Sequence, residues 1–154
     1  EIWEQTGGNL DYFVSGMGTG GTITGTGQYL KEQKPDLKVI GIDPEGSIFS
    51  GDTPRPYQVE GIGYDFWPKV FDVSVVDEMF RVGDRDSFAE ARRLAREEGI
   101  LAGGSTGTVL AGTRQLLQKY DLSGQTVVIM IHDSGRSYLS KMYNDEWMAE
   151  QGLL

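Results

Sequence analysis

The glycine- and threonine-rich run SGMGTGGTITGTG, residues 15–27, is the stretch of this sequence best suited to bind a ligand. It holds six glycines and four threonines in thirteen positions. Because glycine lacks a Cβ atom, its backbone amide can approach an anion closely, and neighbouring hydroxyls add further donors. No lysine or arginine occurs between Glu1 and Leu30. The run therefore predicts an anion site held by dipoles and without a countercharge.

Three interpretations of this glycine run compete. The first is a tight strand-to-helix turn with no ligand. The second is a dinucleotide site, and the third is a cup for the phosphate of a compact cofactor. Gly16, Gly18 and Gly21 satisfy the G-x-G-x-x-G pattern of dinucleotide sites, and Asp43 stands where such a site places its ribose partner. The hydroxyl residues that would assist a phosphate cup are Ser15, Thr19, Thr22 and Thr24. The pattern alone does not separate the last two interpretations.

The elements around the run predict an α/β fold. A short apolar strand is expected at 11–15, a helix at 22–33 and a second strand at 38–43. Strand, glycine loop, helix and strand make a βαβ unit with a parallel strand pair. We therefore expect a three-layer, Rossmann-like domain, with a mainly parallel twisted sheet flanked by helices.

The rest of the chain continues this alternation of strands and helices. Residues 44–69 hold four of the five prolines and predict a long, ordered loop of functional use. The further elements that we expect are a strand at 72–77, a helix at 84–99, a glycine turn at 100–107, a helix at 106–119, a buried strand at 126–131 and a short helical tail at 137–150.

Composition excludes several classes of function. The chain of 154 residues carries a net charge of −9 without a basic stripe, which argues against nucleic acid as a partner. It has no cysteine and one histidine, so neither a zinc cluster nor a Ser–His–Asp triad is expected, and no metal site. No apolar run reaches membrane-spanning length. We expect a single domain in a cytoplasmic, reducing compartment.

Five collinear blocks resemble one family, the fold-type II pyridoxal-phosphate-dependent β-replacement enzymes. The blocks are GTGGTITG (18–25), VIGIDPEGSI (39–48), VEGIGYDF (59–66), EEGILAGGSTG (97–107) and DSGRSYLSKMYNDEWM (133–148). They are closer to the cystathionine β-synthase branch than to the cysteine synthase branch. The family usually has proline before Asp133, where this chain has His132. We expect that histidine to be a hydrogen-bonded structural residue rather than a general base.

The resemblance implies roles for particular residues. The cup around the 5′-phosphate of pyridoxal 5′-phosphate would be formed by Gly18, Thr19, Gly20, Gly21 and Thr22. Ser105 would face the pyridine nitrogen; taken alone, it would be interpreted as the N-cap of the following helix. Gly61, Gly63 and Tyr64 would line the substrate side, with Tyr64 as an auxiliary catalytic residue. The competing interpretation of Tyr64 is an amphipathic residue covering a core edge.

The resemblance also implies a function. The parent enzyme would be a lyase of transsulfuration and cysteine biosynthesis that condenses L-serine with L-homocysteine to cystathionine. The near alternative is cysteine synthesis from O-acetylserine and sulfide. The alternative of another class is a non-catalytic dinucleotide-binding module that uses Gly16, Gly18, Gly21 and Asp43.

The resemblance finally implies an incomplete catalytic unit. Residues 1–154 would be the larger-domain part of a two-domain, homodimeric enzyme. The Schiff-base lysine of the family lies in a smaller upstream domain, and none of the six lysines here has a matching context. We therefore expect the chain alone to be inactive.

Overall fold

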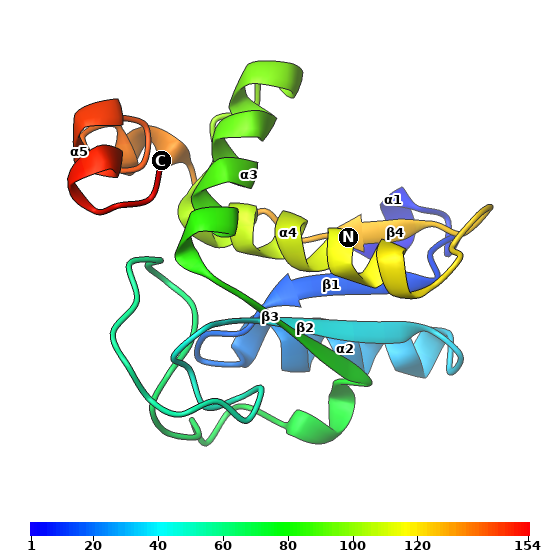
Figure 1. Ribbon diagram of the computed structural model, residues 1–154. Coiled ribbons are helices and arrows are strands. Elements are labelled where there is room, and N and C mark those ends of the chain that lie inside the picture. Colours follow the sequence, from blue (N-terminus) through cyan, green and yellow to red (C-terminus); the bar gives the residue numbers. More distant parts are fainter.

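Four parallel strands form one sheet in the computed structural model, which describes all residues 1–154. They lie in the order β3 (Glu78–Val82), β2 (Lys38–Pro44), β1 (Tyr12–Gly16) and β4 (Val127–Ile129) (Figure 1). All three strand pairs are parallel, which confirms the predicted α/β fold. Because parallel strands end at the same edge, the loops that follow them collect at one side of the sheet.

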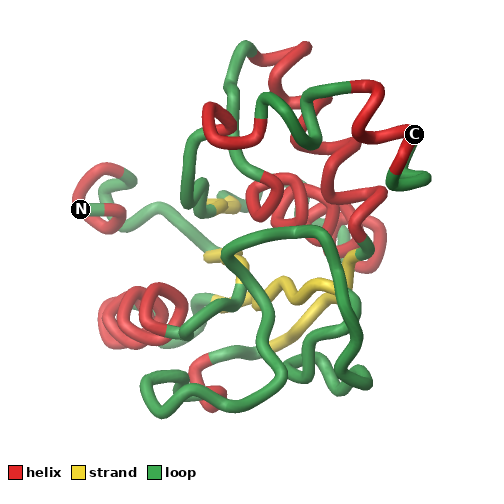
Figure 2. The backbone as a smooth tube through the Cα atoms, turned by 90° about the vertical axis from the view of Figure 1, so that its left-hand side faces the viewer, coloured by secondary structure: helices red, strands yellow, loops and turns green.

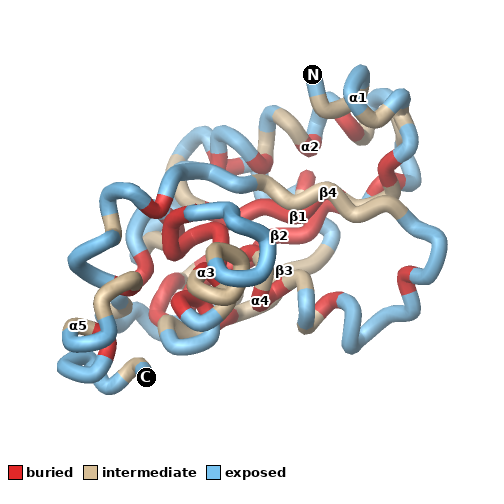
Figure 3. The backbone as a smooth tube through the Cα atoms, turned by 90° about the horizontal axis from the view of Figure 1, so that it is seen from above, coloured by how far each residue is buried: buried red, intermediate tan, exposed pale blue.

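Helices cover both faces of the sheet and make three layers. α2 (Gly21–Gln33) lies on one face and α4 (Gly104–Lys119) on the other, while α3 (Asp84–Glu98) packs on α4 (Figure 1). Successive strand residues point to opposite faces. Accordingly Phe13 belongs to the core under α2, and Val14 belongs to the core under α4. Figure 3 shows β1 largely buried, whereas β4 at the sheet edge is only partly buried.

Four short elements complete the chain. They are α1 (Ile2–Gln5), the 3₁₀-helices η1 (Val73–Val75) and η2 (Gly135–Tyr138), and α5 (Asp145–Glu150). α5 lies beyond α3, away from the sheet (Figure 1), and its apolar residues share a small core with α3. None of the helices is both long and apolar enough to cross a lipid bilayer.

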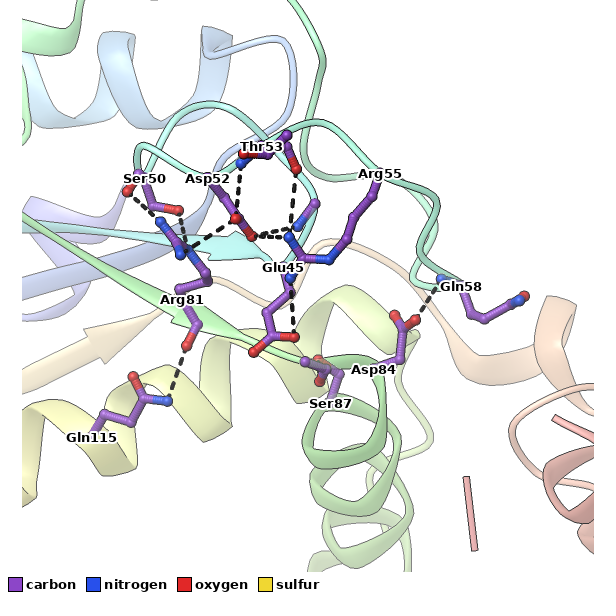
Figure 4. A network of polar contacts seen from close by, with 12 residues as sticks. Glu45, Ser50, Asp52, Thr53, Arg55, Gln58, Arg81, Asp84, Ser87 and Gln115 are labelled. Carbon is purple, nitrogen blue, oxygen red and sulfur yellow. Dashed lines mark hydrogen bonds and ion pairs between the residues drawn. The ribbon is translucent and has the colours of Figure 1, made fainter. Parts of the chain in front are cut away.

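Residues 45–77 connect β2 to β3 as a long loop that contains only η1 (Figure 2). Side chains from β3 and α3 hold it. Arg81 donates from Nε to Ser50 Oγ (3.0 Å) and from Nη2 to Ser50 O (2.7 Å). The carboxylate of Asp84 accepts a hydrogen bond from Gln58 N (2.7 Å) (Figure 4). The predicted ordered loop is therefore confirmed.

The strand predicted at 72–77 is wrong, since the segment forms η1 and β3 begins directly after it. Asp72 caps the turn by accepting from Ser74 N (3.0 Å). Val75 points inward against Gly27 of α2, where a Cβ atom would come within 2.5 Å of Val75 Cγ1. The alternating pattern wrongly predicted a strand, because one buried valine in a capped turn gives the same pattern as a short strand.

Candidate functional site

The first glycine turn, residues 17–20, leads from β1 into α2, and two of its glycines cannot be replaced without a clash. Gly20 is the N-cap of α2 with φ +87°, and a Cβ atom there would lie 2.3 Å from Phe71 Cβ. A Cβ atom on Gly18 would lie 2.8 Å from Gly61 O. The need for glycine here is therefore both conformational and steric.

A second glycine turn lies directly beside the first. Gly61 and Gly63 have φ values of +88° and +78°. Gly63 N donates a hydrogen bond to Met17 O (2.6 Å). The structure thus brings together the 18–22 and 61–63 segments that the sequence singled out separately.

The N-terminus of α2 presents a row of unpaired amides. None of the backbone amides of residues 18–23 donates a hydrogen bond within the protein, and no side chain caps the helix. Beside them lies a hollow of about 80 Å³, enough for a phosphate group but far below the roughly 300 Å³ of a typical small-molecule pocket. Its lining residues are Gly16, Gly18, Thr19, Gly20, Thr22, Ile23, Gly61, Ile62 and His132. We call this hollow the cup.

The four hydroxyl residues expected to assist a phosphate cup are placed differently. Thr19 and Thr22 line the cup and are exposed at its rim. Ser15 is fully buried beneath it. Thr24 is engaged elsewhere, because its Oγ1 accepts a hydrogen bond from Asp72 N (3.1 Å). Three of the four hydroxyls therefore remain near the cup.

Ser105 lies at the N-terminus of the second major helix. It is 3% exposed and is the second residue of α4, whose N-cap is Gly103. The N-cap interpretation of Ser105 is therefore wrong, and its hydroxyl bonds to no other residue. Val109, one turn further on the same face, contacts Gly16 at the end of β1: a Cβ atom there would lie 3.5 Å from Val109 Cγ2. The N-termini of α2 and α4 thus both lie at the carboxyl edge of the sheet.

Asp43 is not available to a ribose hydroxyl. It is fully buried at the end of β2, and its Oδ2 accepts hydrogen bonds from Ser50 N and Ser50 Oγ, both at 2.8 Å. Burial raises the pKa of its carboxyl group, which these hydrogen bonds partly offset. The carboxylate anchors its own loop, so the dinucleotide interpretation lacks its acidic partner.

Tyr64 lies outside the cup. Its amide donates to Ser47 Oγ (3.1 Å), and its ring centroid is 6.3 Å from that of Phe49 and 4.9 Å from that of Phe66. The half-buried ring borders a separate, open groove together with Gly63. These contacts favour its structural interpretation, as the cover of a core edge.

His132 lines the cup, a position that the sequence did not reveal. Its Nε2 lies 3.2 Å from Ser15 Oγ, so the expected hydrogen bond is present. Burial lowers the pKa of the imidazole, and the charge of Asp133 opposes that shift. One feature of the sequence could have indicated this position: His132 directly follows the last strand, at the edge where ligands of α/β sheets bind.

Comparison with known proteins supplies independent evidence. The family model described as "Pyridoxal-phosphate dependent enzyme" matches residues 1–133. The chain is 46% identical over 160 residues to the cystathionine beta-synthase of Mus musculus, and 42% identical over 159 residues to that of Dictyostelium discoideum. A solved structure, the O-acetylserine dependent cystathionine beta-synthase from Helicobacter pylori, superposes with a TM-score of 0.85 at 38% identity.

The coverage of these matches is unequal. Both alignments cover 100% of this chain but only 28% of the mouse protein and 32% of the Dictyostelium protein. The structural match covers 91% of this chain and 45% of the Helicobacter pylori chain. This chain therefore corresponds to less than a third of those curated relatives.

Proposed function

We start from the fact that this chain belongs to the family of pyridoxal-phosphate-dependent enzymes, and we propose that it is the phosphate-binding domain of one that condenses L-serine with L-homocysteine to cystathionine. The observation that carries the proposal is the cup of unpaired amides at the N-terminus of α2. Its size, its glycine cradle and its dipole suit a phosphate monoester.

In this proposal the amides and hydroxyls of Gly18, Thr19, Gly20, Gly21 and Thr22 hold the 5′-phosphate of the cofactor. Glycine at 18 and 20 lets the turn pack against Gly61 and Phe71 without a clash, and so take the shape in which its amides would face the phosphate. Because no lysine or arginine lines the cup, the amides would be the main ligands of the phosphate.

Ser105 would meet the pyridine nitrogen. When bound, pyridoxal phosphate draws electrons away from the bonds at the α-carbon of an amino acid. A serine hydroxyl carries no charge, so it holds the ring nitrogen in place without forcing it to remain protonated, as a carboxylate would. The ring then withdraws electrons less strongly, which is sufficient for the loss of a β-substituent. The position of Ser105 in the first turn of α4, largely buried and with no hydrogen-bond partner in the protein, supports this role.

Gly61, Gly63 and Tyr64 would form the substrate side of the site. The positive φ angles of the two glycines and the bond to Met17 O place this backbone beside the cup. Tyr64 would act only as an auxiliary residue, because its ring packs on Phe49 and Phe66.

The lysine that holds the cofactor covalently would come from another part of the parent protein. Five of the six lysines here are ion-paired away from the cup: Lys31 and Lys38 with Asp77, Lys34 with Asp11, Lys119 with Glu78, and Lys141 with Glu60. None of the six lines the cup. We therefore propose that this chain alone is inactive. From the family resemblance we further propose that the parent is a homodimer that works in the cytoplasm.

The substrates are tested on the full-length protein with two donors and two acceptors. L-serine and O-acetylserine are each paired with L-homocysteine and with sulfide, and product formation is followed. We expect the highest kcat/KM for L-serine with L-homocysteine. The name of the Helicobacter pylori protein makes O-acetylserine with homocysteine the second candidate. Faster formation of cysteine from O-acetylserine and sulfide would identify a cysteine synthase instead.

The role of Ser105 is tested by Ser105→Ala. Because its hydroxyl bonds to no other residue, we expect unfolding stability to change by less than about 0.5 kcal/mol. The visible band of the bound cofactor should shift, and kcat should fall by about tenfold or more. Ser140→Ala, an exposed serine outside the site, is the control and should change neither. If Ser105→Ala left both the spectrum and kcat unchanged, the proposed contact between Ser105 and the pyridine nitrogen would be wrong. Tight binding of NAD by the full-length protein, with no visible cofactor band, would favour the dinucleotide module.

A further inference from the structure

The cup has one ionisable side chain in its lining, and it is His132. Every other lining residue is glycine, threonine or isoleucine. A phosphate dianion in the cup would therefore meet amide dipoles and one imidazole. A charge that enters a site made of neutral groups changes the proton affinity of the nearest titratable group.

The hydrogen bonds assign the tautomer of the free imidazole. Ser15 Oγ lies 3.1 Å from Gly16 O, and a carbonyl oxygen only accepts, so the serine hydrogen points there. The serine oxygen is then left to accept from His132 Nε2, at 3.2 Å. Nε2 carries the hydrogen, and Nδ1, which bonds to no protein group, carries a free lone pair. Nδ1 is thus the atom that can take up a proton.

The uncharged surroundings favour the neutral form of the ring before a phosphate binds, although one side of His132 is open to solvent. Partial burial lowers the pKa of His132, and Asp133, the one charged group with a marked influence on it, raises it in part. The elements packed against the ring present a serine from β1, the glycines of both turns and Ile62, none of which is charged. The Asp133 carboxylate is itself engaged by the Tyr138 hydroxyl (2.7 Å).

We propose that His132 is a cofactor-positioning residue that takes up a proton at Nδ1 when a phosphate group enters the cup, and so supplies the positive charge that the cup lacks. The inference rests on the proposed function. The proton comes from solvent, and no covalent bond forms or breaks. Because binding takes up a proton, affinity must fall as the pH rises through the range in which the free ring is neutral and the bound ring is protonated.

The test compares the full-length wild type with His132→Gln, whose side-chain amide keeps a donor for Ser15 but cannot take up a proton. The probe is 4′-deoxypyridoxine 5′-phosphate, which has no aldehyde and cannot bond to a lysine. Calorimetry in buffers of different ionisation enthalpy gives the protons taken up on binding, and protons that belong to the probe cancel between the two proteins. Urea unfolding checks that the variant is folded.

We expect the wild type to take up more protons than His132→Gln, by as much as one per site. Between pH 7 and pH 9 the wild-type affinity should fall about tenfold more than that of the variant. The imidazole ¹⁵N signals, assigned by their loss in the variant, should move from the neutral to the protonated pattern on binding. Equal proton uptake and equal pH dependence in both proteins would overturn the inference alone. Failure of the wild type to bind the probe at any pH would overturn the proposed function as well.

Discussion

At the scale of single residues, Gly20 combines two demands that only glycine meets. Its φ of +87° is disfavoured for any residue with a Cβ atom, and that atom would lie 2.3 Å from Phe71 Cβ. We expect Gly20→Ala to lower the free energy of unfolding by about 2–4 kcal/mol, from backbone strain and overpacking together. Urea denaturation at fixed pH measures the change.

Gly25 is the matched control for Gly20. It lies in the middle of α2, and a Cβ atom there would meet nothing within 4 Å. Gly25→Ala should therefore stabilise the helix, by about 0.5–1 kcal/mol. If the two variants changed stability alike, the steric role assigned to Gly20 would be wrong.

Single residues also mark the limit of sequence reasoning about the site. A glycine turn at 18 and 20 was predictable, because these residues directly follow β1, whereas Gly61 and Gly63 lie within the long loop and were singled out only through the family resemblance. His132 was not placed in the cup, because its position depends on the pairing of β4 with β1, which brings the segment after β4 next to Ser15. Asp43 fitted the ribose pattern by position, yet its carboxylate bonds to Ser50 in its own loop. Sequence gives the place along a strand but not the direction of a side chain.

At the scale of elements, Asp11 ties three of them together. Its Oδ1 accepts from Lys34 Nζ after the end of α2 (2.7 Å), and its Oδ2 accepts from Thr126 N just before β4 (2.8 Å). The bond from Lys34, followed by that from Thr126, lowers the pKa of Asp11. The ionised form therefore contributes stability above the unfolded-state pKa of about 3.9, and that contribution is lost as the pH falls through the lower folded-state pKa.

We expect Asp11→Asn to destabilise the protein by about 1 kcal/mol at pH 7, a modest value because both partners are about one-third exposed. The difference from the wild type should shrink as the pH is lowered from 5 towards 3. Urea denaturation across that range measures it. Asp36→Asn, an exposed aspartate in the turn that follows Lys34 and without an ion pair, is the control. A difference that stays constant with pH would mean that the charge of Asp11 is not what matters.

Elements were predicted well where two independent signals agreed. The helix at 84–99 had both an apolar stripe and a terminal glycine, and α3 ends one residue before Gly99, which has φ +70°. The apolar run 126–131 predicted a buried strand, but β4 spans three residues and is half-buried. An apolar run does not indicate whether a strand has one neighbour or two, and β4 pairs only with β1.

At the scale of the whole molecule, charge and shape act in opposite directions on an anionic ligand. The chain carries a net charge of −9, which repels a phosphate dianion at long range. The N-termini of α2 and α4 meet at the carboxyl edge of the sheet and attract it at short range. Only the short-range attraction depends on direct contact, so the two effects respond differently to salt.

This balance predicts an unusual salt dependence of cofactor binding. Added salt shortens the screening length from about 10 Å at 0.1 M to about 3 Å at 1 M, which weakens the long-range repulsion but leaves contacts between amides and phosphate almost unchanged. We therefore expect the affinity for 4′-deoxypyridoxine 5′-phosphate to stay within about threefold, or to rise, between 0.05 and 0.5 M sodium chloride. A site closed by lysine or arginine would instead lose affinity steadily as salt is added.

Measuring His132→Gln alongside the wild type separates any contribution of the imidazolium. A tenfold loss of affinity in both proteins would mean that a cation from elsewhere in the parent protein grips the phosphate, and that the amides of α2 are not its main ligands.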